Sequence, residues 1–384
     1  MNFEFATAGR IVFGMGTVKD VGRMAASMGR RALLVTGAAT ERTAPLLASL
    51  TPHGIQAIRF AVPHEPSIET VERGVALARM EGCDMVIGFG GGSPLDAGKA
   101  IAAMLSNPGE VLDYLEIIGK GRALSQAPLP FIAIPTTAGT GAEVTRNAVL
   151  SSPIHRMKVS LRSPLMLPRL VVVDPELTLS VPPAVTAATG LDALTQVIEP
   201  FLSNAANPIT DGFCREGMAR TARSLRKAFA DGSDAAARED MAMTSLLGGL
   251  ALANAKLGAV HGFAGTLGGM FEAPHGAVCA ALLPHAMSVN VKALLTRDPS
   301  NPVLARHDEV ARILTGKAGA TAVDGVAWIR ELCADLRVPG LAAYGLRSDH
   351  FETVIAKAAG ASSMKGNPIL LNAKEMAEIL SRAL

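Results

Sequence analysis

The sequence predicts a two-domain protein, in which an α/β domain built on a doubly wound parallel sheet precedes an all-helical domain. Residues 31–175 alternate short β-rich runs with helical patterns, an order typical of a parallel sheet with helices on both faces. Beyond residue 184, almost every segment is rich in Ala, Leu and Met at helical spacing. The 384 residues also exceed the usual size of one domain. We therefore place a boundary near residue 180, between domains 1–180 and 181–384.

The first domain should contain five buried strands separated by helices. The strands are expected at residues 31–36, 55–62, 83–92, 130–137 and 170–175, where apolar and β-branched residues form short runs. Helices are expected around 42–50, over 67–82 and over 93–105, where apolar residues recur at helical spacing. The segment 4–14 is a further strand candidate.

The second domain should consist of helices alone. Its apolar residues recur with a helical period and are interrupted by Gly and Pro, which end helices and open turns. The expected helices are 184–203, 207–229, 234–255, 257–270, 277–295, 303–319, 323–336, 348–359 and 373–383.

The composition is that of a globular protein. Apolar residues make up 49% of the chain, and the formal charge of +2 gives no reason to expect nucleic acid or an anionic membrane as a partner. No uncharged apolar stretch reaches the ~18 residues of a transmembrane helix, and the first residues lack a signal-peptide pattern. The four cysteines form no CxxC pair, so we interpret them as reduced core thiols of a soluble, cytoplasmic protein. They are Cys83, Cys214, Cys279 and Cys333.

A glycine-rich stretch, GFGGGSPLDAGKA at residues 88–100, follows one of the expected strands and opens a helix. Glycines let the backbone approach a phosphate, and the free N–H groups of a helix N-terminus favour an anion. Ser93 could cap this helix, and Pro94 suits its first turn. The stretch is neither a GxGxxG motif nor a Walker A motif, because Lys99 lies too deep in the helix. A strand–helix turn without a ligand remains the alternative.

A second loop, IPTTAGTGAEVT at residues 134–145, follows the next strand and is rich in hydroxyl groups. Its threonines could bind a diphosphate, a ribose or a nicotinamide carboxamide, although a polar turn with local Thr–backbone bonds would look the same. Two such loops at the carboxyl ends of strands match the place where doubly wound sheets bind nucleotides.

Metal-ligand candidates lie in the second domain. Asp192 and Gln196 are four residues apart and would share one helix face. His261, His275 and His285 fall within one short stretch, although a lone His on an apolar helix is more often a core residue. Imidazole and carboxylate together suit Zn²⁺ or Fe²⁺, and such an ion could polarise an alcohol or carbonyl oxygen.

Six motifs in order make the sequence resemble the iron-containing (group III, metal-dependent) alcohol dehydrogenases over about residues 5 to 380. They read GRIVFGMGTVKDVG, GFGGGSPLDAGKAIA, PTTAGTGAEVT, DPELTLSVPP, ATGLDALTQVIE and GAVHGFAGTLGG…APHGAVCAALLPH. The resemblance implies a dehydroquinate synthase-like architecture, with an N-terminal dinucleotide-binding domain and a C-terminal helical metal-binding domain. It implies oxidation of alcohols, or reduction of aldehydes or ketones, with NAD(H) or NADP(H). It also implies a homodimer, for which the strand 4–14 would be the pairing edge.

The resemblance also implies functional residues. The cofactor diphosphate would lie at Gly91, Gly92, Ser93, Pro94 and Leu95, and the ribose and nicotinamide near Thr136, Thr137, Thr140, Thr145 and Lys158. The divalent ion, Fe²⁺ or Zn²⁺, would be held by Asp192, Gln196, His261 and His275, and the two histidines would be the catalytic pair.

Three departures from the family pattern affect these expectations. Gln196 stands where the family usually has a His ligand, so we expect weaker metal binding and higher occupancy in Gln196→His. Gly265 replaces a His near the nicotinamide, so a proton would pass through water, the ribose hydroxyl or His285. Gly37 replaces an Asp that binds the ribose 2′-hydroxyl, and the nearby Arg42 could attract a 2′-phosphate. These last two residues favour tolerance of NADP or use of both cofactors.

Two alternatives stay open from sequence. One is a metal-free enzyme similar to the maleylacetate reductases, in which His261 or His275 would act as a general acid. The other is a nucleotide-binding homologue with impaired catalysis, which the Gln196 and Gly265 replacements favour. The sequence does not identify the substrate beyond a small alcohol, aldehyde or ketone.

Overall fold

The computed structural model describes residues 2–155, 157–271 and 273–384 and divides into two compact units. The α/β unit comprises Ala6–Thr137 and Gly141–Leu179. The helical unit comprises residues 2–5, Ala138–Thr140 and the described residues of Ser180–Leu384. The second threonine-rich loop therefore contributes three residues to the helical unit.

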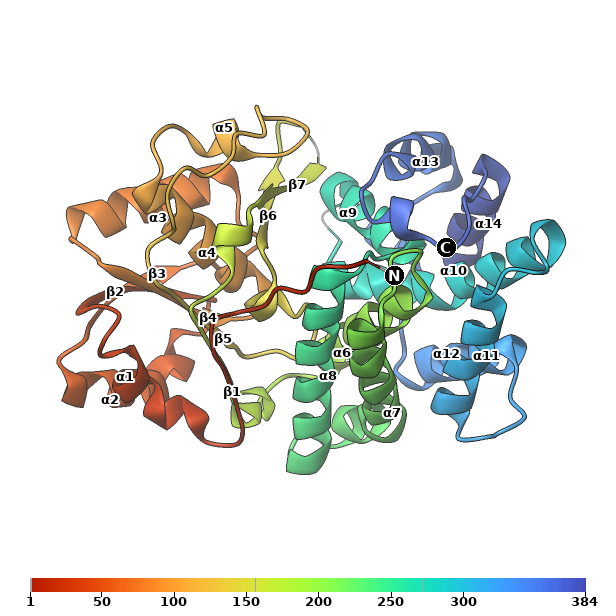
Figure 1. The fold of residues 1–384 in the computed structure, drawn as a ribbon, viewed down its shortest axis with the longest axis horizontal. Helices are drawn as coiled ribbons and strands as arrows, with labels where there is room; N and C mark the ends of the chain where they lie inside the picture. The colour runs from red at the N-terminus through yellow and green to blue at the C-terminus, as the bar shows by residue number, and fades with distance from the viewer. Residues whose placement is uncertain (1, 156, 272) are drawn as a thin grey trace. The chain divides into compact units, whose positions relative to one another are not determined.

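The α/β unit is built on a six-stranded sheet in which every pair of neighbouring strands is parallel (Figure 1). The order across the sheet is β1-β8-β5-β4-β2-β3. The strands are β1 (Ile11–Phe13), β2 (Arg31–Thr36), β3 (Gln56–Ala61), β4 (Met85–Gly90), β5 (Phe131–Pro135) and β8 (Leu170–Val173). All five predicted strands are present. The sixth strand, β1, falls within the segment 4–14, the further strand candidate; it lies at one edge of the sheet and pairs with β8 of the same chain.

Helices cover both faces of the sheet, which confirms the doubly wound arrangement (Figure 1). The helices of this unit are α1 (Val21–Ala25), α2 (Ala44–Leu50), α3 (Ile68–Met80), α4 (Gly92–Ser106) and α5 (Val111–Tyr114). Alternate strand residues such as Leu34 and Ile87 pack with Val21 and Leu46 from α1 and α2. On the other face, α4 approaches β5 so closely that a Cβ on Gly98 would lie 2.7 Å from the Phe131 ring.

The strand order places a topological switch point between β2 and β4. From β2 the chain continues outward to β3, whereas from β4 it continues in the opposite direction to β5 and β8. Loops that leave adjacent strands in opposite directions open a crevice at the carboxyl edge of the sheet. The loop after β2 begins at Gly37 and the loop after β4 at Gly91, so both glycine positions lie at this edge.

A two-stranded antiparallel hairpin, which was not predicted from the sequence, also belongs to the α/β unit. Its strands are β6 (Asn147–Ser152) and β7 (Met157–Arg162). Burial alternates along β6 because one face packs on α4 and the other is more accessible. This alternation is weaker than the continuous apolar runs of the main sheet.

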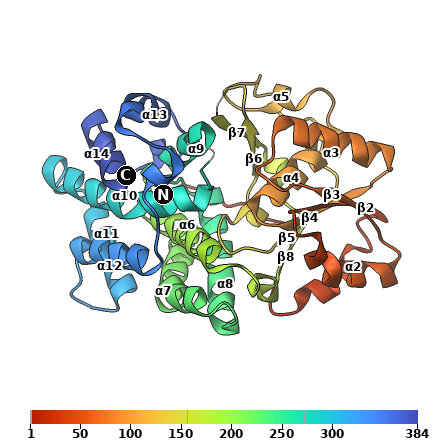
Figure 2. The same ribbon diagram turned by 180° about the vertical axis from the view of Figure 1, so that it is seen from behind.

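The helical unit is organised around α6, whose neighbours are α7, α8 and α10 (Figures 1 and 2). The helices are α6 (Pro183–Leu202), α7 (Pro208–Ala230), α8 (Ala235–Asn254), α9 (Ala259–Phe271), α10 (His275–Arg297), α11 (Val303–Thr315), α12 (Ala322–Asp335), α13 (Phe351–Ala359) and α14 (Ala373–Ala383). Each corresponds to a predicted helix. Fifteen of the 20 residues of α6 are buried, which makes it the central helix of this core.

Among the described residues, α10 is the only unbroken helix that is long and apolar enough to cross a membrane. However, 78% of its most apolar 18-residue stretch is buried inside the fold. Its apolar residues, including Val278, Leu282 and Leu283, belong to the core of the helical unit. The composition of α10 is therefore that of a core helix.

Candidate active site

The first part of the site is a row of three polar side chains on α6. Asp192, Gln196 and Glu199 follow one another at helical spacing, so they share a face of the helix. Their exposed fractions are only 1%, 2% and 8%. Buried polar groups in proteins are nearly always paired, so each of these three side chains requires a partner.

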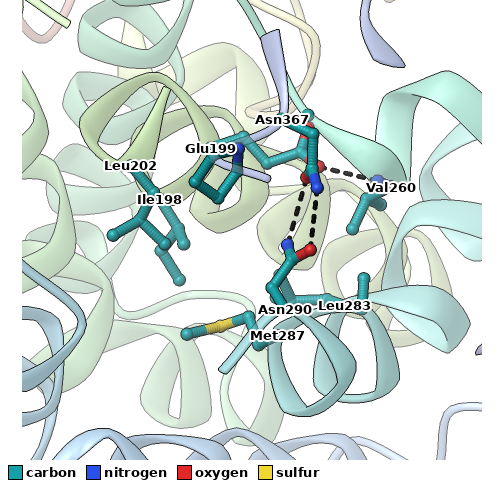
Figure 3. A pocket seen from close by; sticks show the side chains of 11 residues that line it. Ile198, Glu199, Leu202, Val260, Leu283, Met287, Asn290 and Asn367 are labelled. Atoms are coloured by element: carbon teal, nitrogen blue, oxygen red, sulfur yellow. Dashed lines mark hydrogen bonds between the residues drawn. The ribbon is translucent and has the colours of Figure 1, made fainter. Parts of the chain in front are cut away.

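Glu199 finds its partners on α9. No hydroxyl, amide or carboxylate side chain in residues 256–258 could cap this helix. Instead, the backbone N–H of Val260 donates to Glu199 Oε1 at 2.7 Å (Figure 3). The backbone N–H of Ala259 donates to Asn367 Oδ1 at 3.1 Å. Side chains distant in sequence thus satisfy the first turn of α9, which fixes where the helix begins.

Asn367 is itself held by Asn290 of α10. The two amides exchange hydrogen bonds: Asn290 Nδ2 donates to Asn367 Oδ1 at 3.1 Å, and Asn367 Nδ2 donates to Asn290 Oδ1 at 2.7 Å (Figure 3). Asn290 and Asn367 are both 6% exposed. A buried and fully paired network of this kind is rigid, so it holds α9 against α6 and α10.

The same Glu199 carboxylate orients His261. Because a carboxylate accepts, His261 Nδ1–H donates to Glu199 Oε2, at 2.7 Å. Nε2 therefore faces the opposite direction, and it lies 3.4 Å from Asp192 Oδ1. A carboxylate behind a histidine in this way fixes the ring and leaves the other nitrogen free to bind a metal. Glu199 is not among the residues predicted from the sequence, although its three-residue spacing from Gln196 on α6 places it on the same helix face.

His275 begins α10 and faces the same point. Its Nε2 lies 3.8 Å from Asp192 Oδ1, and its ring centroid is 5.5 Å from that of His261. Gly276 permits this approach, since a Cβ there would lie 2.7 Å from the backbone oxygen of Ala188 on α6. The His275 side chain is 33% exposed, so it forms the open side of the cluster.

Cys279 completes the cluster. Its interpretation as an ordinary core thiol is therefore wrong, because its sulfur lies among the metal-ligand candidates. It is buried, and none of the four cysteines forms a disulfide, but its Sγ lies 3.7 Å from His275 Nε2 and 4.0 Å from His261 Nε2. The donor atoms of Asp192, His261, His275 and Cys279 all lie within 4.8 Å of one another. The sequence feature that could have identified Cys279 is its i, i+4 spacing from His275, which places both side chains on one face of α10.

The electrostatics of the cluster favour a bound cation. Both carboxylate oxygens of Asp192, and Gln196 Oε1, are buried without a hydrogen-bond partner among the described residues. Burial alone would raise the pKa of Asp192, but His275, His261 and the Gln196 amide outweigh it and lower that pKa to about 2. An ionised carboxylate and an amide oxygen without donors, beside two imidazoles, are groups that a divalent ion would satisfy.

We expect Glu199→Gln to weaken metal binding by about 10- to 100-fold, because an amide orients His261 less strongly than a carboxylate does. Isothermal titration with Zn²⁺ measures this change. The exposed Glu239→Gln is the matched control and should bind like the wild type. Equal affinity in Glu199→Gln and the wild type would show that the hydrogen bond to His261 does not support the ion.

Two other positions do not join the cluster. His285 lies ten residues beyond His275 on α10, about 15 Å along the axis, so it cannot replace a proton carrier here. Its pKa is lowered to about 4 by burial and by the cationic Arg330 and Arg382, which face it from α12 and α14. A Cβ at Gly265 would meet open space, so no side chain occupies that place.

In the α/β unit, the two predicted nucleotide loops touch. The N–H of Thr136 donates to the Gly90 carbonyl at 2.9 Å, and a Cβ on Gly91 would lie 3.2 Å from Thr137 Oγ1. Gly91 is the N-cap of α4, so the amides of Gly92 and Ser93 in the first turn have no acceptor within the helix. The expectation that Ser93 caps α4 is wrong, because the helix begins one residue before it.

The remaining predicted cofactor residues have structural partners. Pro94 and Leu95 are buried in the first turn of α4. Thr145 Oγ1 accepts from the Lys99 ammonium at 2.9 Å. Lys158 on β7 forms an ion pair with Glu65 at 2.5 Å. Thr140 belongs to the segment that joins the helical unit.

The loop after β2 bears on the choice of cofactor. A Cβ on Gly37 would meet nothing within 4 Å, so a larger side chain fits at this position. Arg42 donates to the carbonyl of Leu177 at 2.5 Å, and burial lowers the pKa of its guanidinium. One N–H of Arg42 is thus engaged by the protein itself, so a 2′-phosphate would be met by the remaining N–H donors of the guanidinium.

The sequence and the fold of this chain are similar to those of known proteins. Residues 8–175 match the model of iron-containing alcohol dehydrogenase, and residues 186–384 match that of the Fe-containing alcohol dehydrogenase family, C-terminal. A choline dehydrogenase of Bacillus subtilis is 35% identical over 377 residues, which cover 97% of this chain and 92% of that protein.

Solved structures agree over the whole chain. A crystal structure of 1,3-propanediol oxidoreductase superposes with a TM-score of 0.93 at 34% identity and covers 100% of both chains. The NAD⁺ complex of sulfoacetaldehyde reductase from Bifidobacterium kashiwanohense gives a TM-score of 0.87 at 27% identity, over 100% of this chain and 99% of that chain. The chain therefore belongs to the iron-containing alcohol dehydrogenase family.

Proposed function

We propose that the protein is an NAD(P)-dependent alcohol dehydrogenase that interconverts a small alcohol and its aldehyde or ketone. Hydride would pass between the carbinol carbon and C4 of the nicotinamide. The observation that supports this most strongly is the buried cluster of Asp192, His261 and His275, whose donor atoms face one point. Relatives named for choline, 1,3-propanediol and sulfoacetaldehyde point to small alcohols and aldehydes as the substrate class.

The residues of the cluster have separable roles. A divalent ion bound there would withdraw electrons from the substrate oxygen and so favour hydride transfer. Asp192, Gln196, His261 and His275 were predicted to hold it, and Glu199 keeps the His261 ring turned toward it. The exposed edge of His275 leaves the cluster accessible on one side. The hydroxyl proton of the alcohol would pass to solvent or to the ribose hydroxyl, since residue 265 has no side chain and His285 lies elsewhere.

A metal-free mechanism fits these residues less well. Without a cation, Gln196 Oε1 would remain buried with no donor, and the charge of Asp192 would be balanced only by the two histidine nitrogens, 3.4 Å and 3.8 Å from Oδ1. We therefore favour a mechanism in which His261 and His275 bind a divalent ion rather than act as general acids.

We expect Gly37→Asp to reduce kcat/KM with NADP(H) on the order of tenfold and to leave NAD(H) activity nearly unchanged. The new carboxylate would repel a 2′-phosphate at the switch point of the sheet, and the open space around Gly37 accommodates it. Gly37→Ser is the control that adds a side chain without a charge, and its kcat/KM values with NADP(H) and NAD(H) should be close to those of the wild type. An equal loss with both cofactors would argue that residue 37 does not face the ribose.

The assignment is tested by following NAD(P)H absorbance with a panel of short alcohols, diols, choline and short aldehydes. Steady turnover of at least one primary alcohol is expected, together with a divalent metal in protein purified without chelators. No turnover with any substrate, in protein that binds NAD(P)H and holds the metal, would favour the catalytically impaired alternative.

We further propose that the protein acts as a homodimer in the cytoplasm. The outer edge of β1 has no strand partner among the described residues, which leaves it available to a second copy of the chain. Light scattering after gel filtration would report the mass, and a monomer at micromolar concentration would contradict the dimer.

A further inference from the structure

We propose that Cys279 supplies a thiolate ligand to the divalent ion, so that the donor set is Asp192, His261, His275 and Cys279. Gln196 then lies beside this set rather than in it. A sulfur-containing set favours Zn²⁺ over Fe²⁺. The inference rests on the proposed function only in assuming that the cluster binds a divalent ion.

Four of the distances between the donor atoms suit four protein ligands around one ion, which would expand to five-coordinate when a substrate oxygen binds. In a zinc tetrahedron with bonds of about 2.0–2.1 Å to nitrogen or oxygen and about 2.3 Å to sulfur, neighbouring donors lie about 3.3–3.6 Å apart. The His261 and His275 nitrogens lie 3.4 Å and 3.8 Å from Asp192 Oδ1. The same nitrogens lie 4.0 Å and 3.7 Å from Cys279 Sγ. A contraction of a few tenths of an ångström would bring these four pairs to coordination geometry.

Two local features make the sulfur available. His275 and Cys279 are four residues apart on α10, so the helix presents both donors on one face. Among the described residues, the hydrogen-bond contacts of Sγ are with the two Nε2 atoms alone. When the ion binds, the thiol proton leaves to solvent and the S–metal bond forms in its place, as is usual for coordinated cysteine.

Gln196 is the competing fourth ligand. Its Oε1 is buried and has no hydrogen-bond partner among the described residues, which fits a ligand as well as a neighbour of the site. A neutral amide oxygen, however, is a weaker donor to Zn²⁺ or Fe²⁺ than a thiolate, and Zn²⁺ sites are formed by Cys, His, Asp and Glu. With Cys279 in place, the expected loss of affinity from Gln196 is compensated within the same cluster.

X-ray absorption of the zinc-loaded full chain tests the proposal directly. We expect one sulfur scatterer at about 2.3 Å, with the remaining scatterers at about 2.0–2.2 Å. A first shell of nitrogen and oxygen alone would overturn the proposal. This measurement requires no variant and no activity, so failure of the proposed dehydrogenase function would not alter its outcome, and active enzyme without sulfur would reject only the ligand.

Cobalt substitution assigns the sulfur to a residue. Wild-type protein loaded with one equivalent of Co²⁺ should show an intense near-ultraviolet thiolate-to-cobalt band. The band should disappear in Cys279→Ser and persist in Gln196→Leu and in the control Cys333→Ala. Cys333 contacts the backbone of α10 but no donor of the cluster. Persistence of the band in folded Cys279→Ser, or its loss in Gln196→Leu with retention in Cys279→Ser, would overturn the assignment.

Discussion

Asp192→Asn is expected to lose the divalent ion and to reduce kcat/KM on the order of 100- to 1000-fold. The carboxylate is the one anionic oxygen donor whose atom lies within 4 Å of both histidine Nε2 atoms among the described residues. An amide would remove the charge that attracts the cation, and metal polarisation of a substrate oxygen contributes several kcal/mol. Metal analysis after dialysis and steady-state kinetics measure the two effects.

The exposed Asp349→Asn provides the control and should retain both metal and activity. The apo forms of Asp192→Asn and wild type are measured first, because the substitution conserves side-chain volume but changes a buried charge. Zn²⁺ should then raise the melting temperature of the wild type but not of the variant. Full activity of metal-free Asp192→Asn would instead support the metal-free alternative.

Lys99→Met is expected to lower the free energy of unfolding of the α/β unit by about 3–5 kcal/mol, the usual result of breaking a buried ion pair. The ammonium is fully buried and lies 3.0 Å from Asp96 Oδ1. It donates to the Ala142 carbonyl and to Thr145 Oγ1, both at 2.9 Å, and also to the Asn147 carbonyl. Methionine fills a similar volume but leaves these acceptors without a donor.

The same substitution should weaken NAD(H) binding, since Lys99 joins α4 to the threonine-rich loop through Thr145. Urea denaturation and cofactor fluorescence titration measure the two effects. The control is Lys19→Met, whose side chain is 72% exposed and whose ion pair should contribute little. An unchanged unfolding midpoint in Lys99→Met would mean that solvent replaces the lost donor.

Sequence patterns predicted the regular elements well because most of them are long and strongly periodic. Continuous apolar runs predicted strands such as β4, and helical spacing predicted α6 and α10 within a few residues. The hairpin β6–β7 was not predicted, because it packs through one face only and its hydrophobic pattern is therefore weaker than that of the buried strands. Ser93 was misplaced as a cap because the helix begins in the glycine run, where no side chain signals its start.

The site was predictable only where its residues share one helix. The spacing of Asp192 and Gln196 predicted a common face, and the same rule would have added Glu199 and, on α10, Cys279. Spacing does not tell which faces of α6, α9 and α10 meet. For that reason His285 looked equivalent to His261 and His275, although it faces Arg330 and Arg382.

The Glu199 carboxylate serves two purposes at once, since one oxygen satisfies the first turn of α9 and the other orients His261. Local unfolding of α9 would therefore release a metal-binding nitrogen and an uncapped amide together. By mass action, an ion that binds only the closed form suppresses this opening in proportion to its concentration. Metal availability in the cell would thus set the fraction of molecules with an assembled active site as well as its chemistry.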